Sequence, residues 1–130
     1  MREIGSTKNT RVAIDSMKNR LHVNLFGDAL RADENQQVPA FVEQGCAQLK
    51  PGFTCLADYT QLKLFGLPDV ARDVMAVMMR AGVRKVATVW PDESFAKLVL
   101  GSAAKDTGDA YLSKRQTFTD LDSANAWLDK

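Results

Sequence analysis

The sequence predicts an α/β domain, a mixed and mostly parallel sheet of about five strands with helices packed on it. Short apolar runs alternate along the chain with longer segments whose apolar residues recur at helical spacing. The stretch from Phe53 to Gly82 has the pattern of a buried strand, a loop and a helix, which is the building block of layered α/β proteins. We expect the element order ββαβαβαβα.

Length and composition predict a single domain over residues 1–130, with residues 1–9 flexible. Hydrophobic residues make up 45% of the chain and charged residues 25%, as in ordinary globular proteins. The 17 basic and 16 acidic side chains leave a net charge of +1, so we expect no nucleic-acid partner. No apolar stretch has the length of a membrane-spanning helix or the form of a secretion signal, and we therefore expect a cytoplasmic protein without an integral membrane segment.

Cysteine and histidine usage argues against a metal site. Cys46 and Cys55 both lie within apolar patterns, which predicts small buried residues rather than a disulfide. His22 is the only histidine, and the two cysteines lack the spacing of a zinc site. We expect neither a metal nor a cofactor.

The first two strands form a predicted β-hairpin. Residues 11–17 and 21–26 alternate between apolar and polar positions, and the polar residues 18–20 separate them. Gly27 marks the expected end of the second strand. His22 lies on its polar face, where a half-exposed histidine is a simpler interpretation than a catalytic base.

A helix and a buried strand come next. Pro39 suits the first turn of a helix that begins near Gln37 and stops at residues 50–52. The strand over residues 53–57 has almost no polar residue, as expected for a strand covered on both faces. An irregular loop is expected from Asp58 to the next helix.

The helix over residues 68–82 has an apolar sector too wide for packing on a sheet alone. Met75 and Met79 widen this sector, so something besides the sheet has to cover it. A neighbouring helix, a subunit interface and an adaptable apolar pocket are the alternatives, and a homodimer through this face or through an edge strand is one expectation.

The C-terminal part continues the alternation. Residues 84–90 are predicted to form a strand, and residues 91–94 to start the next helix. Residues 111–118 are extended but polar, which suits the edge of the sheet. A short helix over residues 122–128 ends the chain.

From Arg11 onward the chain resembles the SpoIIAA-like group of the STAS-like superfamily, which is related in architecture to the lipid-binding CRAL-TRIO/Sec14 domains. The resemblance is in the element order and in three patterns: Leu49 to Phe53 before the third strand, Gly82 to Ala87, and the ending from Phe118 to Leu128. It implies a SpoIIAA-like fold and a binding or regulatory role.

Anti-sigma-factor antagonists of this superfamily carry the motif D-x-S-G-L after the third strand, where a kinase phosphorylates the serine. Asp58 to Leu62 occupies that place here, with Thr60 at the position of the serine and Gln61 at that of the glycine. The resemblance therefore implies Thr60 as the candidate phosphorylation site of a partner switch.

The leading hypothesis is a non-catalytic regulatory or binding domain that holds a small apolar, lipid-like ligand or a protein partner. The partner switch at Thr60 is the alternative, and an enzyme comes last because no catalytic motif is present. The candidate ligand or partner site comprises Asp58, Tyr59, Thr60, Leu62, Phe65, Leu67, Met75, Met79 and Trp90.

Overall fold

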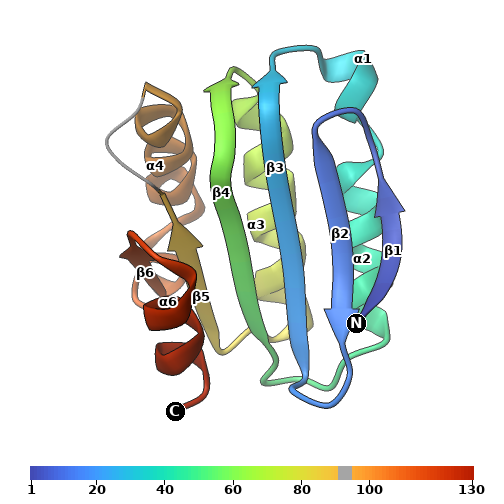
Figure 1. Ribbon diagram of the computed structural model, residues 1–130, viewed down its shortest axis with the longest axis vertical. Coiled ribbons are helices and arrows are strands. Elements are labelled where there is room, and N and C mark those ends of the chain that lie inside the picture. The colour runs from blue at the N-terminus through green and yellow to red at the C-terminus, as the bar shows by residue number, and fades with distance from the viewer. Residues whose placement is uncertain (91–94) are drawn as a thin grey trace.

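A computed structural model of the chain describes residues 1–90 and 95–130, and the side chains of all of these except 95 and 96. Its centre is one six-stranded sheet in which the strands lie side by side in sequence order (Figure 1). The strands are β1 (Arg2–Ser6), β2 (Thr10–Asp15), β3 (Arg20–Ala29), β4 (Thr54–Phe65), β5 (Lys85–Val89) and β6 (Arg115–Phe118). The helices are α1 (Ala32–Asn35), α2 (Val38–Ala47), α3 (Pro68–Ala81), α4 (Phe95–Thr107), α5 (Asp109–Leu112) and α6 (Leu121–Leu128).

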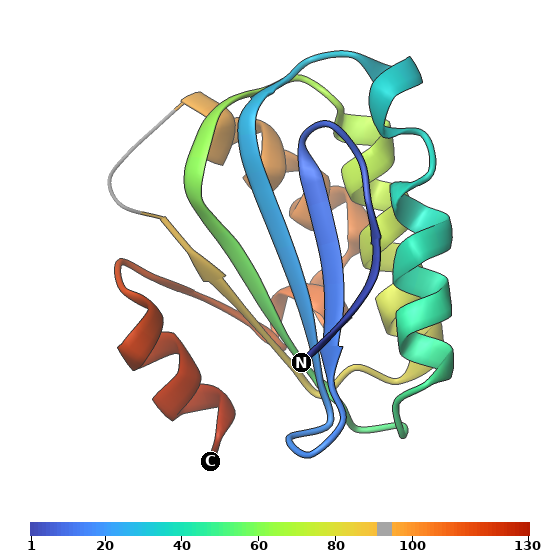
Figure 2. The ribbon, with the colours of Figure 1, turned by 45° about the vertical axis from the view of Figure 1, so that its right-hand side comes forward.

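The two faces of the sheet are covered unequally. Strands β1 to β3 pair antiparallel, while β3 to β6 pair parallel. Each parallel step moves in the same direction across the sheet, so right-handed crossovers place α2, α3 and α4 on one face. Helix α6 follows the last strand and lies on the opposite face, over β4 and β5 (Figures 1 and 2). The predicted mixed, mostly parallel sheet with packed helices is confirmed, with six strands instead of about five.

The N-terminal segment differs from the expectation of a flexible start, because Arg2–Ser6 pairs antiparallel with β2 as strand β1. Ile4 packs against the core, and a Cβ at Gly5 would lie 2.6 Å from the ring of Phe41 on α2. One apolar residue in a polar segment gives no periodic signal, so the strand is decided by its contacts with β2 and α2.

Strand β4 is also longer than predicted. Its twelve residues continue through the expected loop after Asp58, and β3 continues past Gly27 to pair with it. The register between β3 and β4 shifts twice along this extension. Such bulges interrupt the alternation of apolar and polar residues, so sequence periodicity does not predict this half of the strand.

The C-terminal third agrees with the predicted order of elements. Strand β6 is short and lies at the edge of the sheet, as its polar sequence predicts. The extended segment expected over residues 111–118 is strand only from Arg115, because Tyr111 belongs to α5. The helix start predicted at residues 91–94 lies outside the described residues.

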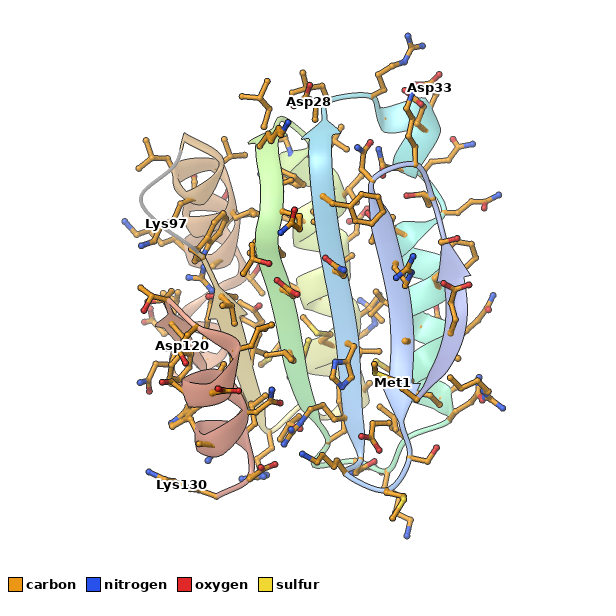
Figure 3. The ribbon with its side chains drawn as sticks, viewed as in Figure 1. Met1, Asp28, Asp33, Lys97, Asp120 and Lys130 are labelled. Atoms are coloured by element: carbon orange, nitrogen blue, oxygen red, sulfur yellow. The ribbon has the colours of Figure 1, made fainter. Side chains whose placement is uncertain are left out.

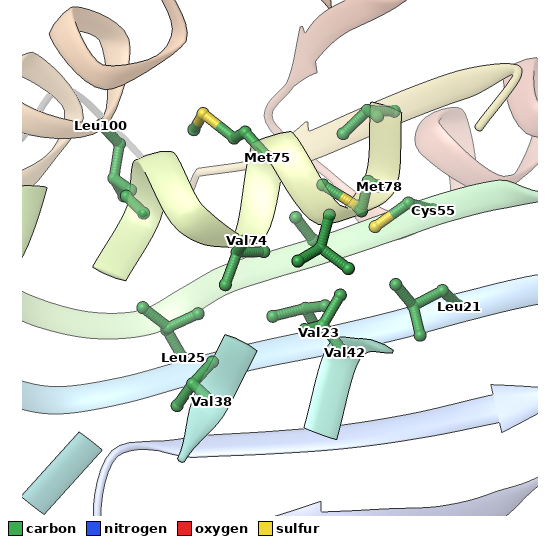
Figure 4. Packing of buried hydrophobic residues seen from close by; sticks show 14 of the residues in the cluster. Leu21, Val23, Leu25, Val38, Val42, Cys55, Val74, Met75, Met78 and Leu100 are labelled. Atoms are coloured by element: carbon green, nitrogen blue, oxygen red, sulfur yellow. The ribbon is translucent and has the colours of Figure 1, made fainter. Parts of the chain in front are cut away.

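Neighbouring helices cover the wide apolar sector of α3. Helix α3 packs between α2 and α4, and only 4% of the Met75 surface is exposed. Val74, Met75 and Met78 lie among the side chains of the central core (Figure 4). A homodimer would therefore need another surface, such as the edge strand.

A buried arginine joins the sheet to α6. Arg20 is 2% exposed and donates to Thr54 Oγ1 at 2.9 Å, to Asn125 Oδ1 at 2.9 Å and to Asp129 Oδ1 at 2.8 Å. The first acceptor lies on β4, and the other two lie on and just after α6. A buried charge with three partners holds elements that are far apart in the sequence.

Replacing this arginine should destabilise the protein. We expect Arg20→Met to lower the free energy of unfolding by about 3 kcal/mol in urea denaturation, because three acceptors lose a charged donor. Arg11→Met is the control, since the Arg11 side chain is 58% exposed in its ion pair with Glu3. Its loss should cost about 0.5 kcal/mol or less. Equal losses in the two variants would contradict the role given to Arg20.

Candidate functional site

A small, partly open cavity of about 40 Å³ lies between the sheet and the layer formed by α2, α3 and α4. Its wall is almost wholly apolar, and Leu25, Val74 and Met78, which form part of it, are labelled in Figure 4. The lining residues are Thr10, Val23, Leu25, Ala29, Asn35, Val38, Cys55, Ala57, Tyr59, Phe65, Leu67, Val70, Ala71, Val74, Met75, Met78, Val86, Leu100 and Tyr111. The cavity therefore runs through the centre of the fold and borders most of its elements.

Two of the polar lining residues belong to a closed hydrogen-bond network. Asn35 of α1 accepts from Thr7 Oγ1 at 2.8 Å and from Thr10 Oγ1 at 3.4 Å, and its amide nitrogen donates to Asn9 and to the Arg31 carbonyl. This network anchors α1 to the turn between β1 and β2. Its polar atoms are engaged within the protein, so this end of the cavity is structural.

Two tyrosines form the other polar part of the wall. Tyr59 and Tyr111 are 7% and 2% exposed, and in the described part of the chain neither hydroxyl has a hydrogen-bond partner. Burial raises the pKa of both phenols far above the ordinary value, which keeps them neutral at physiological pH. Both remain available as hydrogen-bond donors.

Trp90 lies directly behind the first of these tyrosines. The ring centroids of Tyr59 and Trp90 are 4.7 Å apart, with the ring planes tilted by 55°. Trp90 is 2% exposed, and its Nε1 has no partner among the described residues. An aromatic pair thus closes the cavity toward β5.

The predicted site residues separate into two groups. Tyr59, Phe65, Leu67 and Met75 line the cavity, and Trp90 stands next to it. Leu62 is buried in the core and Met79 is partly buried against it, although neither lines the cavity. The sequence does not predict Tyr111 as a site residue, because its segment has the pattern of an edge strand.

Asp58 and Thr60 lie on the opposite face of the sheet. Asp58 Oδ1 accepts from the Thr60 amide at 3.0 Å and from Thr60 Oγ1 at 2.7 Å. Asp58 also lines a shallow cleft of about 230 Å³ on this open face, together with His22 and Asn24. Burial, followed by the charge of Arg20, lowers the pKa of the half-buried His22.

A wider and more polar cleft of about 510 Å³ lies at the carboxyl ends of β5 and β6. Lys97 and Asp120, both labelled in Figure 3, line it along with Trp90 and Phe118. Asp120 accepts from the Ser123 amide at 2.7 Å and so caps α6. This carboxylate is therefore already used in the fold.

The cysteines are buried and unpaired, as the sequence predicts. Burial raises the pKa of Cys46 to about 11, and it raises the pKa of Cys55 further. In the described part of the chain no three His, Cys, Asp or Glu side chains gather closely enough to hold a metal. None of the described helices is long and apolar enough to cross a membrane.

Comparison with known proteins gives one informative result. Neither a protein-family model nor a curated protein matches the sequence. The structure is similar to that of an uncharacterised DUF3478-family protein from Shewanella loihica PV-4 that is described as having a SpoIIAA-like fold. The two share 20% identity with a TM-score of 0.59, over 95% of this chain and 99% of the other. The chain therefore has a SpoIIAA-like fold, as the resemblance in its sequence implied.

Proposed function

We propose that this protein is a non-catalytic binding domain that holds a small apolar, lipid-like ligand between its sheet and its helix layer. The observation that supports this proposal is the cavity in the centre of the core, whose wall is apolar except for a few neutral polar groups. Concave apolar sites with few oriented polar groups are typical of small-molecule binding.

The cavity has to expand to accept such a ligand. Its 40 Å³ compares with about 150 Å³ for a cavity that binds benzene. Met75 and Met78 form part of the wall, and flexible thioether side chains repack at low cost. Ligand binding would thus be coupled to repacking of α3 against the sheet.

The ligand would enter the cavity at the carboxyl ends of β3 and β4. Ala29, Phe65 and Leu67 line the cavity there. Leu30 and Leu64 lie beside them in the sequence and are 52% and 43% exposed. Apolar side chains thus continue from the surface to the cavity at this end.

Filling the cavity should abolish binding. We expect dodecanoic acid at 100 times its dissociation constant to raise the melting temperature by about 10 °C, and Val74→Phe to remove this rise because the ring occupies the cavity.

Val77→Phe is the matched control for this substitution. Val77 lies one turn along α3 and is as buried as Val74, but it lines a separate groove of about 340 Å³ between α2 and α3 instead of the cavity. The control should keep the rise in melting temperature. If both variants respond to dodecanoic acid like the unmodified protein, the cavity is not the ligand site.

The proposal includes that the protein is not an enzyme. The reactivity of the two cysteine thiols tests this part, because a catalytic cysteine would react rapidly in the folded protein. With a pKa of about 11, Cys46 is a thiolate in only about one molecule in a thousand at pH 8. Burial also disfavours the thiolate of Cys55. We expect a thiol reagent to modify neither cysteine within minutes in the folded protein, and both after denaturation. Rapid modification of Cys55 in the folded protein would favour an enzyme.

A partner switch at Thr60 is the second candidate. The observation that favours it is the hydrogen bond from the Thr60 hydroxyl to Asp58, a residue that lines the cleft on the open face. A phosphate on this hydroxyl would replace the hydrogen bond by repulsion between two anions. The change would occur on a surface that α2, α3 and α4 leave free for a partner.

Two substitutions at Thr60 test the switch. Thr60→Val should lower the free energy of unfolding by about 1 kcal/mol, since it removes one hydrogen bond but keeps the shape. Thr60→Glu should in addition change which proteins co-purify with the domain from its own host, as measured by mass spectrometry. Unchanged partners in both variants would exclude the switch.

A further inference from the structure

Unpaired polar atoms gather on the helix-covered face of β5 and β6. Thr88 Oγ1, Trp90 Nε1 and Arg115 Nε are buried, and within the described residues none of them has a hydrogen-bond partner. Thr88 and Trp90 are each 2% exposed. An unpaired buried polar atom is destabilising and rare, so three in one region need an explanation.

Strand register places Arg115 and Thr88 beside the cavity. Arg115 pairs with Val86, which lines the cavity, and Thr88 pairs with Ala57, which also lines it. The charge of Arg115 acts on both Tyr59 and Tyr111, where it opposes the effect of burial on the phenol pKa. The arginine therefore lies within electrostatic reach of the two hydroxyls that face the cavity.

The group is rich in donors and poor in acceptors. Arginine and tryptophan nitrogens only donate, whereas the hydroxyls of Tyr59, Tyr111 and Thr88 can do either. No ion pair of Arg115 is found among the described residues, so its positive charge has no carboxylate partner there. The Arg115 side chain is partly buried and its Nε is shielded from solvent, so an anion at that place would stabilise its charge.

We infer that the ligand is an acyl chain with a carboxylate, whose two oxygens accept from Arg115 and from the neighbouring tyrosine hydroxyls while the chain lies in the cavity. This inference rests on the proposed function and assigns the chemistry of the ligand. A planar carboxylate fits the side edge of a guanidinium, where Nε and one terminal nitrogen donate in parallel. A cationic head group would be repelled, and a wholly apolar ligand would leave the donors unpaired.

The experiment compares dodecanoic acid with methyl dodecanoate by calorimetry. The ester keeps the chain but loses the charge. We expect the protein to bind the acid about 10-fold or more tightly than the ester, since hydrogen bonds to a charged group are stronger than neutral ones. Arg115→Met should remove this preference and leave the affinity for the ester unchanged.

Arg84→Met is the control, because Arg84 lies just before β5 and donates to the Leu128 carbonyl of α6 on the other face. The Arg84→Met variant should keep the preference for the acid.

Thr88→Val tests whether the unpaired polar atoms have a binding role or a structural one. Without ligand, Thr88→Val should unfold at the same temperature as the unmodified protein or at a higher one. The Thr88 hydroxyl that it removes has no hydrogen-bond partner among the described residues.

The possible failures have different meanings. Equal affinity for acid and ester in the unmodified protein would overturn the carboxylate assignment and leave the proposed function standing. An unchanged preference for the acid in Arg115→Met would also overturn the carboxylate assignment. The same conclusion would follow if ligand-free Arg115→Met and Thr88→Val were both unfolded at room temperature. Binding of neither compound would overturn the proposed function itself.

Discussion

The handedness of the crossovers determines how the rest of this molecule is arranged. Because β3 to β6 advance in one direction, right-handed connections place α2, α3 and α4 on the same face. Three helices on that face create a thick apolar layer, and the cavity lies where the layer meets the sheet. The other face receives only α6, which Arg20 fastens to β3 and β4. One topological constraint thus yields an enclosed face suited to a ligand and an open face suited to a partner.

The alternation of β4 divides a contiguous sequence motif between these two faces. Tyr59 points into the helix-covered side, while its neighbours Asp58 and Thr60 hydrogen-bond to each other on the open side. Ligand binding and a phosphate switch would therefore use adjacent residues without sharing a surface. The register between β3 and β4 shifts directly after Asp58, so Tyr59 and Thr60 lie within the bulge.

The unpaired donors near the cavity weaken the fold that contains them. Thr88, Trp90 and Arg115 each bury a polar atom that has no partner in the part of the chain that the structure describes. Local rules of stability are broken in this way mostly where a protein binds something. The Asn35 network provides a contrast, since its polar atoms are satisfied internally and serve only to hold α1. The buried polar groups at the Asn35 end of the cavity thus stabilise the fold, whereas those near Arg115 are proposed to bind the ligand.

The sequence by itself determined the kind and order of most elements. Apolar periodicity over Pro68–Ala81 and alternation in the hairpin depend on local spacing, so helix α3 and strands β2 and β3 follow from composition and pattern. Strand β1 and the second half of β4 were decided by tertiary contacts, because a bulge or a polar segment carries no period. The same holds for the site. Five of its predicted residues lie at the cavity, whereas Tyr111, Thr88 and Arg115 are brought there only by strand pairing and helix packing. Sequence patterns report which side of an element is apolar, and tertiary structure alone decides which elements share a cavity.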